Sequence, residues 1–325
     1  MKVVILGAGA YGLSLCSMFY ENNCDITIWC NNKEKADELN KTRENKEKLP
    51  GYIIPDDIII TSDIEYAIKN KDLIVIAVPA KAVDTISIKI ANLICGVQHI
   101  CIASKGIEQD TCLFVYDVVK KYVKSNNIAI ISGGSFATDI IKKVPIGLTL
   151  ATKNKVTEQI VKMSLQNKYL KLRSTNDIIG TEICGSIKNV IAIAAGMIAG
   201  MNLPEVTKVM FITEALHDIK SLIKALGGNK NTILSFAGFG DILLTCTSEK
   251  SRNFTLGYMI GQKQSKEKIN EYIGNTTIEG LYTLKSIHKL LNKKKVDIPI
   301  IDLIYDIIYN DKQPDDLIVF LNEKD

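Results

Sequence analysis

The chain has 325 residues, of which 46% are hydrophobic and 23% charged, and its net charge is +4 from 40 basic and 36 acidic side chains. This composition excludes a mainly disordered chain, which would combine low apolar content with high net charge. The nearly balanced charge argues against a nucleic-acid partner, and the length predicts about two domains.

The cysteines and the apolar segments indicate where the protein works. The eight cysteines are scattered and form no C-x-x-C pair, so neither a zinc site nor a redox site of thioredoxin type is expected, and a reducing compartment fits best. The N-terminus imitates a signal peptide, but its apolar stretch, Val3–Gly7, is short. A later uncharged run, Asn189–Pro204, is too short and too rich in glycine to make a convincing membrane span. We therefore expect a cytoplasmic protein with no stable membrane anchor.

Short β-rich runs alternate with helical patterns in the first half of the chain. The predicted strands cover residues 3–6, 26–29, 58–61, 73–78, 99–103, 128–131 and 147–151. Most are continuously apolar, as strands covered on both faces of a parallel sheet must be. Alternation with helices indicates βαβ units, so we predict a Rossmann-type doubly wound α/β sheet.

The pattern changes to helices alone after about residue 176. Predicted helices cover residues 187–201, 206–226, 252–262, 282–292 and 300–309. Residues 187–201 are apolar all round, which is typical of a buried helix. We therefore predict a dinucleotide-binding domain over residues 1–176 and an all-α substrate-binding domain over residues 177–325.

A glycine motif of the form G-x-G-x-x-G, made by Gly7, Gly9 and Gly12, follows the first strand and opens the first helix. In that position Gly7 allows the tight turn, Gly9 lets the backbone approach a pyrophosphate, and Gly12 lets the helix pack on the strand. The N–H groups at the start of the helix favour phosphate. We therefore expect a bound dinucleotide.

The end of the second strand bears on the choice between NAD and NADP. The stretch Ile26–Asn32 lacks the usual acid that binds a ribose 2′-hydroxyl and would repel a 2′-phosphate. Its absence leaves both cofactors open. Lys33 and Lys35 lie near enough to favour acceptance of NADPH.

Four later segments carry polar residues at positions suited to chemistry. SKGIE at 104–108 and SGGSFA at 132–137 each follow a strand, at the edge of a sheet where ligands bind in this fold. KNVIAIAAGM at 188–197 places a lysine at the start of an apolar stretch, and GDILLTCTSEKSRNF at 240–254 combines an acid with Ser-Arg-Asn. Together with IEG at 278–280, these motifs resemble the NAD(P)-dependent glycerol-3-phosphate dehydrogenase family in its bacterial form, over nearly the whole chain.

The resemblance implies roles for individual residues. Lys188 would be the catalytic acid or base. Substrate would be bound by Lys105, Gly133, Ser135, Lys188, Asp241, Ser251, Arg252 and Asn253. The cofactor would be bound by Gly7, Gly9, Ala10, Tyr11, Gly12, Asn31, Lys105, Ala137, Arg252, Thr277 and Glu279.

These roles agree with the chemistry of the residues. A lysine can exchange the hydroxyl proton while hydride passes to or from a nicotinamide, provided that its pKa is brought toward the working pH. Arg252 suits a phosphate because its planar fork binds two oxygens at once. Asp241 could orient Lys188, or it could cap a helix.

The sequence departs from the family in two places. Gly134 stands where the family usually has proline, which loosens that loop. Glu214-Ala215 stands where Arg-Gly is common, which affects contacts of a helix more than the chemistry.

The resemblance implies an oxidoreductase that interconverts dihydroxyacetone phosphate and sn-glycerol 3-phosphate with NAD(P)H and supplies phospholipid synthesis. It leaves a homodimer open. Two alternatives remain, a non-catalytic NAD(P)-sensing protein and another β-hydroxyacid-type dehydrogenase of the same architecture.

Overall fold

The computed structural model describes residues 1–323 and divides the chain into two compact units. Unit 1 contains Met1–Lys105 and Val115–Ile178, and unit 2 contains Gly106–Phe114 and the chain from Ile179 onward. The sequence placed a single boundary at residue 176 and assigned Gly106–Phe114 to the first domain. This segment belongs to unit 2 because Ile107, Cys112 and Phe114 are buried in its hydrophobic core.

Unit 1 is built on one eight-stranded sheet with the order β3-β2-β1-β4-β5-β6-β7-β8. The strands are β1 (Lys2–Leu6), β2 (Asp25–Trp29), β3 (Ile59–Thr61), β4 (Leu73–Ile76), β5 (His99–Ile102), β6 (Ile128–Ser132), β7 (Ile146–Ala151) and β8 (Leu170–Thr175). The first six strands are parallel, β7 is antiparallel to β6, and β8 is parallel to β7. This order confirms the predicted Rossmann-type doubly wound sheet.

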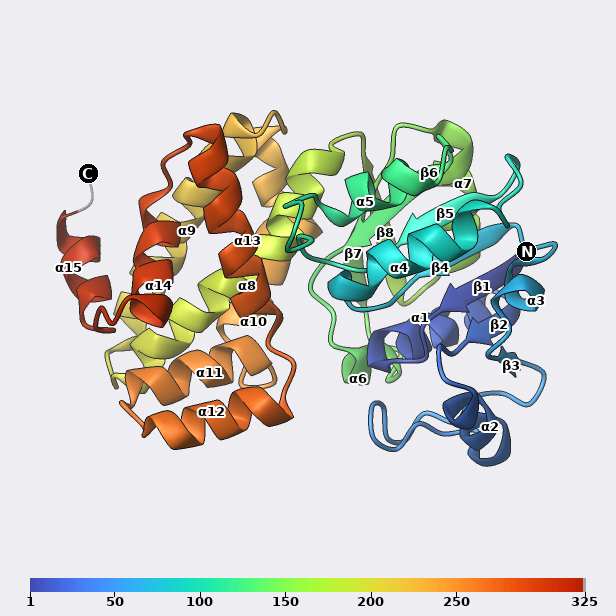
Figure 1. The fold of residues 1–325 in the computed structure, drawn as a ribbon, viewed down its shortest axis with the longest axis horizontal. Helices are drawn as coiled ribbons and strands as arrows, with labels where there is room; N and C mark the ends of the chain where they lie inside the picture. The colour runs from blue at the N-terminus through green and yellow to red at the C-terminus, as the bar shows by residue number, and fades with distance from the viewer. Residues whose placement is uncertain (324–325) are drawn as a thin grey trace. The chain divides into compact units, whose positions relative to one another are not determined.

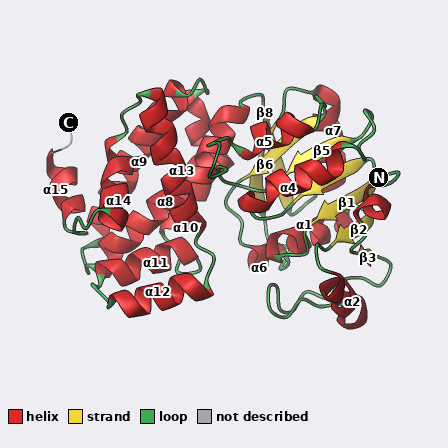
Figure 2. Ribbon diagram, viewed as in Figure 1, coloured by secondary structure: helices red, strands yellow, loops and turns green. Residues whose placement is uncertain are grey.

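Helices cover both faces of this sheet, as the ribbon views show (Figures 1 and 2). The helices of unit 1 are α1 (Ala10–Glu21), α2 (Lys33–Thr42), α3 (Ile64–Ile68), α4 (Ala80–Ala91), α5 (Val115–Tyr122), α6 (Ala137–Ile140) and α7 (Lys155–Leu165). Helices α1 and α7 contact each other, as do α4 and α5. Every residue of β4 and β5 is buried, which explains why their sequences are continuously apolar.

Strand β8 was not predicted, and its sequence explains why. The exposed residues Lys171 and Arg173 alternate with the buried residues Leu170 and Leu172. The strand lies at the edge of the sheet and therefore alternates, whereas the prediction rested on continuous apolar runs.

Unit 2 is helical from Ile179 onward, which confirms the predicted all-α C-terminal region (Figure 2). Its helices are α8 (Ile178–Gly200), α9 (Glu205–Ala225), the 3-10 helix η1 (Lys230–Leu234), the π-helical turn η2 (Phe236–Gly240), α10 (Asp241–Cys246), α11 (Arg252–Gly261), α12 (Lys266–Asn275), α13 (Glu279–Lys294), α14 (Pro299–Tyr309) and α15 (Asp316–Glu323). The short or exposed helices α10, α12 and α15 were not predicted.

Helix α8 is the central element of the unit 2 core. Within residues 1–323 it is the one helix long and apolar enough to cross a membrane, yet 89% of its apolar window is buried inside the protein. Its burial against the other helices accounts for its composition without a membrane. Met197 on this helix is fully buried, whereas Met210 on α9 is 43% exposed.

A seam of four glycines joins α8 to α11. The glycines are Gly196, Gly200, Gly257 and Gly261. A Cβ atom at Gly257 would overlap the carbonyl oxygen of Ile193, and one at Gly196 would overlap that of Phe254. The two backbones are therefore in direct contact, which fixes α11 along the second half of α8.

Candidate active site

The glycine turn between β1 and α1 has the geometry that a dinucleotide needs. Gly7 has φ of +121°, a value that favours glycine, and a Cβ there would lie 2.6 Å from the carbonyl oxygen of Ala77. A Cβ at Gly12 would overlap the carbonyl oxygen of Gly7. Gly9 precedes α1, makes no side-chain cap, and has open space where its Cβ would be. The open approach to uncapped N–H groups fits the pyrophosphate of NAD or NADP.

Four predicted residues of unit 1 lie close together at the carboxyl edge of the sheet. The Lys105 ammonium donates to the carbonyl oxygen of Gly133 at 3.1 Å and lies 6.0 Å from the centre of the Tyr11 ring. The Tyr11 hydroxyl is 3.5 Å from Ser135 Oγ. The residues come from α1 and from the turns after β5 and β6, because neighbouring parallel strands end at one edge.

The remaining predicted residues of unit 1 lie at other points of this edge. Ala10 is the first residue of α1, and Ala137 is the first residue of α6. Asn31 is exposed just after β2, where its side-chain oxygen is 3.5 Å from Lys89 Nζ. Gly133 is held close to β7, since a Cβ there would lie 2.8 Å from the carbonyl oxygen of Gly147.

Lys188 and Asp241 form a largely buried ion pair in unit 2. The distance from Lys188 Nζ to Asp241 Oδ1 is 2.5 Å, and the side chains are 13% and 1% exposed. Asp241 is the first residue of α10, and Thr245 Oγ1 donates to the same carboxylate oxygen at 3.3 Å. The carboxylate favours the protonated form of Lys188 and fixes its position.

The thiol of Cys246 also borders this ion pair. Burial raises the pKa of Cys246 to about 12, with smaller opposing contributions from the charges of Lys188 and Asp241. The thiol therefore stays neutral at physiological pH and adds no charge to the pair.

A chain of hydrogen bonds connects the residue after Lys188 with two other helices. Asn189 donates to Glu279 Oε2 at 3.2 Å, and Asn253 Nδ2 donates to Asn189 Oδ1 at 3.0 Å. The backbone N–H of Gly280 donates to Asn253 Oδ1 at 2.9 Å. This network ties the starts of α11 and α13 to α8, and it places the predicted residues Asn253 and Glu279 in one cluster with Asn189.

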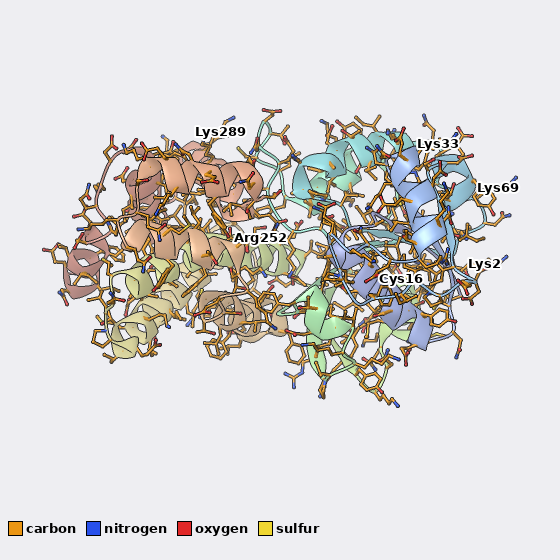
Figure 3. All side chains as sticks on the ribbon, turned by 90° about the horizontal axis from the view of Figure 1, so that it is seen from below. Lys2, Cys16, Lys33, Lys69, Arg252 and Lys289 are labelled. Atoms are coloured by element: carbon orange, nitrogen blue, oxygen red, sulfur yellow. The ribbon has the colours of Figure 1, made fainter. Side chains whose placement is uncertain are left out.

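The start of α11 has the features of an anion-binding site. Ser251 caps the helix by accepting the N–H of Phe254, and Arg252 is its exposed first residue (Figure 3). A guanidinium beside a helix N-terminus suits a phosphate. Thr277 lies exposed between α12 and α13, two residues before Glu279.

The structure adds residues to the site that the sequence did not single out. Asn189 joins Asn253 to Glu279, and Thr245 supports Asp241. Two features of the sequence could have indicated these residues. Asn189 directly follows Lys188, and Thr245 stands four residues after Asp241, one helical turn along α10. Within residues 1–323, no group of three or more His, Cys, Asp or Glu side chains could hold a metal ion.

Comparisons with known proteins agree with this arrangement. The family model for the N-terminus of NAD-dependent glycerol-3-phosphate dehydrogenase matches residues 2–158, and the model for its C-terminus matches residues 177–319. The chain belongs to the NAD-dependent glycerol-3-phosphate dehydrogenase family. The first match covers most of unit 1, and the second covers most of unit 2.

Individual members of the family are similar over nearly their whole length. A glycerol-3-phosphate dehydrogenase [NAD(P)+] of Fusobacterium nucleatum is 35% identical over 96% of this chain and 93% of its own. One from Staphylococcus haemolyticus is 32% identical over 100% of this chain and 98% of its own. The crystal structure of glycerol-3-phosphate dehydrogenase from Coxiella burnetii matches with a TM-score of 0.91 and 28% identity, covering 99% of each chain.

The two departures from the family motifs lie outside the hydrogen-bond networks described above. Gly134 is half-buried in the turn after β6. Ala215, where the family commonly has glycine, is fully buried in the unit 2 core. Glu214 is half-buried on α9. The residues Lys188 and Asp241 are present and paired.

Proposed function

We propose that this protein is an enzyme that reduces dihydroxyacetone phosphate to sn-glycerol 3-phosphate, reversibly, with NADH or NADPH. The observation that carries the proposal is the buried ion pair between Lys188 and Asp241, in a chain that belongs to the NAD-dependent glycerol-3-phosphate dehydrogenase family. A non-catalytic NAD(P)-sensing protein would have no need of a buried lysine held by a carboxylate.

The proton-transfer role is proposed for Lys188. The nicotinamide, when bound, supplies or accepts hydride. In the reducing direction the Lys188 ammonium donates a hydrogen bond to the ketone oxygen and then gives it a proton. In the oxidising direction Lys188 takes the proton from the hydroxyl group. Asp241 holds the Lys188 ammonium in place and favours its charged form.

The substrate phosphate is proposed to bind at the start of α11. Arg252 supplies two parallel N–H donors, and Ser251 and Asn253 flank it at the helix N-terminus. The Asn189–Asn253 hydrogen bond supports this site by fixing the helix start.

Unit 1 is proposed to supply the remaining contacts. Lys105, with Gly133 and Ser135, binds substrate, and the glycine turn receives the dinucleotide phosphates. The further cofactor contacts are proposed for Ala10, Tyr11, Asn31, Ala137, Arg252, Thr277 and Glu279.

The cellular setting is also part of the proposal. The product is the backbone of glycerol phospholipids, so we place the enzyme in the cytoplasm as a supplier of their synthesis. All eight cysteines are free thiols, and seven of them are buried, which supports a reducing compartment.

The assembly is proposed to be a homodimer, on the support of one apolar face of α9. Val206, Val209 and Met210 lie on neighbouring turns and are 71%, 60% and 43% exposed. Sedimentation velocity of Val209→Glu, compared with Val156→Glu on α7 as an equally exposed control, tests this. A dimer that Val209→Glu alone dissociates is expected, and a wild-type monomer would contradict it.

The activity itself is tested by mixing purified protein with dihydroxyacetone phosphate and following the absorbance of NADH and then of NADPH. We expect oxidation with at least one of them, and sn-glycerol 3-phosphate as the product. The absence of turnover with both nucleotides, in protein that binds them, would contradict the proposal and favour a nucleotide sensor. Turnover of a 2-oxo acid instead would favour another dehydrogenase of this architecture.

A further inference from the structure

The end of β2 lacks the acid that selects NAD in many dinucleotide-binding folds. Cys30, Asn31 and Asn32 follow the strand, and none carries charge. Asn32 accepts the N–H of Lys35 and caps α2. An acid here would bind a ribose 2′-hydroxyl and repel a 2′-phosphate. Selection between the two cofactors therefore depends on the charges that other elements bring to this point.

The two lysines that the sequence offered for this purpose are poorly suited to it. The Lys35 ammonium is bound to Glu38 at 2.9 and 3.0 Å, so its charge is largely neutralised. Lys33 is exposed at the start of α2, where Figure 3 labels it at the surface. A side chain in that setting is free to remain in solvent.

Another lysine reaches this point from a different helix. Lys89, on α4, lies 58 residues beyond Asn31 in the chain, and its Nζ is 3.5 Å from Asn31 Oδ1. The same ammonium is 5.9 Å from the centre of the Trp29 ring. Trp29 is 2% exposed and donates from Nε1 to the carbonyl oxygen of Ser62 at 3.0 Å. The last residue of β2 is thus a fixed platform for the lysine.

The charge of Lys89 is available to an anion. It forms no ion pair with any carboxylate of residues 1–323, and its side chain is exposed. Asn31 and the Trp29 ring hold the ammonium without neutralising it, and a phosphate would form a charge-assisted hydrogen bond with it.

We propose that Lys89 is the residue that selects NADP, by binding the 2′-phosphate of the adenosine ribose beside Asn31. This inference rests on the proposed function for the presence of a dinucleotide and deepens it by naming the determinant of specificity. The Lys89 ammonium adds little to the affinity of a nucleotide with a free 2′-hydroxyl. It adds more to the affinity of one with a dianionic 2′-phosphate, which gains a charged partner.

The first test measures binding without turnover. Isothermal titration of the whole protein with adenosine 2′,5′-bisphosphate and with AMP compares the wild type with Lys89→Gln. We expect the variant to weaken bisphosphate binding about tenfold, as the loss of one charge-assisted hydrogen bond would, and to leave AMP binding unchanged. Lys89→Arg should restore tight binding, and Lys35→Gln, the matched control, should leave both constants unchanged.

An unchanged bisphosphate constant in Lys89→Gln would overturn the inference, as would an equal loss for AMP. The ratio of kcat/KM for NADPH to that for NADH should also fall about tenfold in Lys89→Gln. The two proposals can fail separately. A Lys89-dependent bisphosphate affinity without turnover would overturn only the proposed activity, and turnover with an unchanged cofactor ratio would overturn only the role of Lys89.

Discussion

Lys105 in unit 1 and Lys188 in unit 2 hold their ammonium groups in different ways. One contact of the Lys105 ammonium is a hydrogen bond to the backbone carbonyl of Gly133, at 3.1 Å. Lys188 lies 2.5 Å from a carboxylate that is 1% exposed. A lysine held by a carbonyl suits the binding of an anion, and one held by a buried carboxylate suits the delivery of a proton from a fixed position.

The surroundings of the two lysines differ as well. The edge of the sheet in unit 1 is open above Gly9 and uses glycine turns to admit phosphate. Unit 2 uses glycine for a different purpose, because its four-glycine seam brings α11 into backbone contact with α8. The seam allows Asn253 to bond to Asn189 next to Lys188. Unit 1 therefore leaves space beside its glycine turn, and unit 2 holds the proposed catalytic groups through close backbone packing.

Apart from the loss of Lys188 itself, the largest effect that would test this comparison is expected from Asp241→Asn. The variant removes the charge of the carboxylate but keeps its volume, so Lys188 loses the partner that fixes it and favours its charged form. We expect kcat to fall about a hundredfold, within the range for a positioned acid or base. Steady-state assays across pH should show the rate of ketone reduction falling at lower pH than in the wild type. An unchanged kcat and pH profile would mean that the pair is only structural.

The next effect concerns the phosphate site at the start of α11. Arg252→Ala should raise the KM for dihydroxyacetone phosphate about thirtyfold, since one charged contact of the phosphate is lost. Dihydroxyacetone, which has no phosphate, is the control substrate, and its slow turnover at saturating cofactor should not change. An equal loss with both substrates would contradict a phosphate-binding role for Arg252.

A smaller effect is expected in unit 1. Lys105→Met should raise the KM for dihydroxyacetone phosphate about tenfold while kcat falls less, because the lysine binds rather than transfers a proton. The matched exposed control is Lys81→Met on α4. A loss of kcat as large as that of Asp241→Asn would contradict the division of roles between the two lysines.

The smallest effect concerns the stability of unit 1 in acid. Hydrogen bonds from Ser174, Lys162 and Lys155 lower the pKa of Glu158 to about 2. The pKa of Glu158 is lower in the folded than in the unfolded protein. Its contribution to the stability of the fold is therefore complete above pH 4.5 and is lost as the pH falls toward 2. Glu158→Gln should lower Tm by a few degrees at pH 7, and the difference from the wild type should close near pH 2. A difference in Tm that persists at pH 2 would show that it does not come from the charge of Glu158.

Much of unit 1 could be predicted because its strands are buried on both faces and therefore continuously apolar. The edge strand β8 escaped prediction because Lys171 and Arg173 alternate with its buried residues. In unit 2 the long helix α9 showed a clear helical period, and α8 was recognised from a stretch that is apolar all round. The short helix α10 and the exposed helix α12 offered too few buried positions to set a period.

The candidate residues could be named from motifs, but their contacts could not. The bond between Asn189 and Asn253 depends on how closely α8 and α11 pack, which follows from glycines on both helices. The contact of Lys89 with Asn31 joins residues that are 58 positions apart and lie on separate elements. Local sequence patterns cannot predict either contact, since each is set by tertiary packing.

The central claim, that Lys188 transfers the proton, is tested most directly by Lys188→Ala. We expect kcat for reduction of dihydroxyacetone phosphate to fall about a thousandfold, with the affinity for NADPH unchanged in a titration, and added methylamine to restore part of the rate. The restored rate should increase with the concentration of the protonated amine. A Lys188→Ala protein that turns over at the wild-type rate would contradict the account.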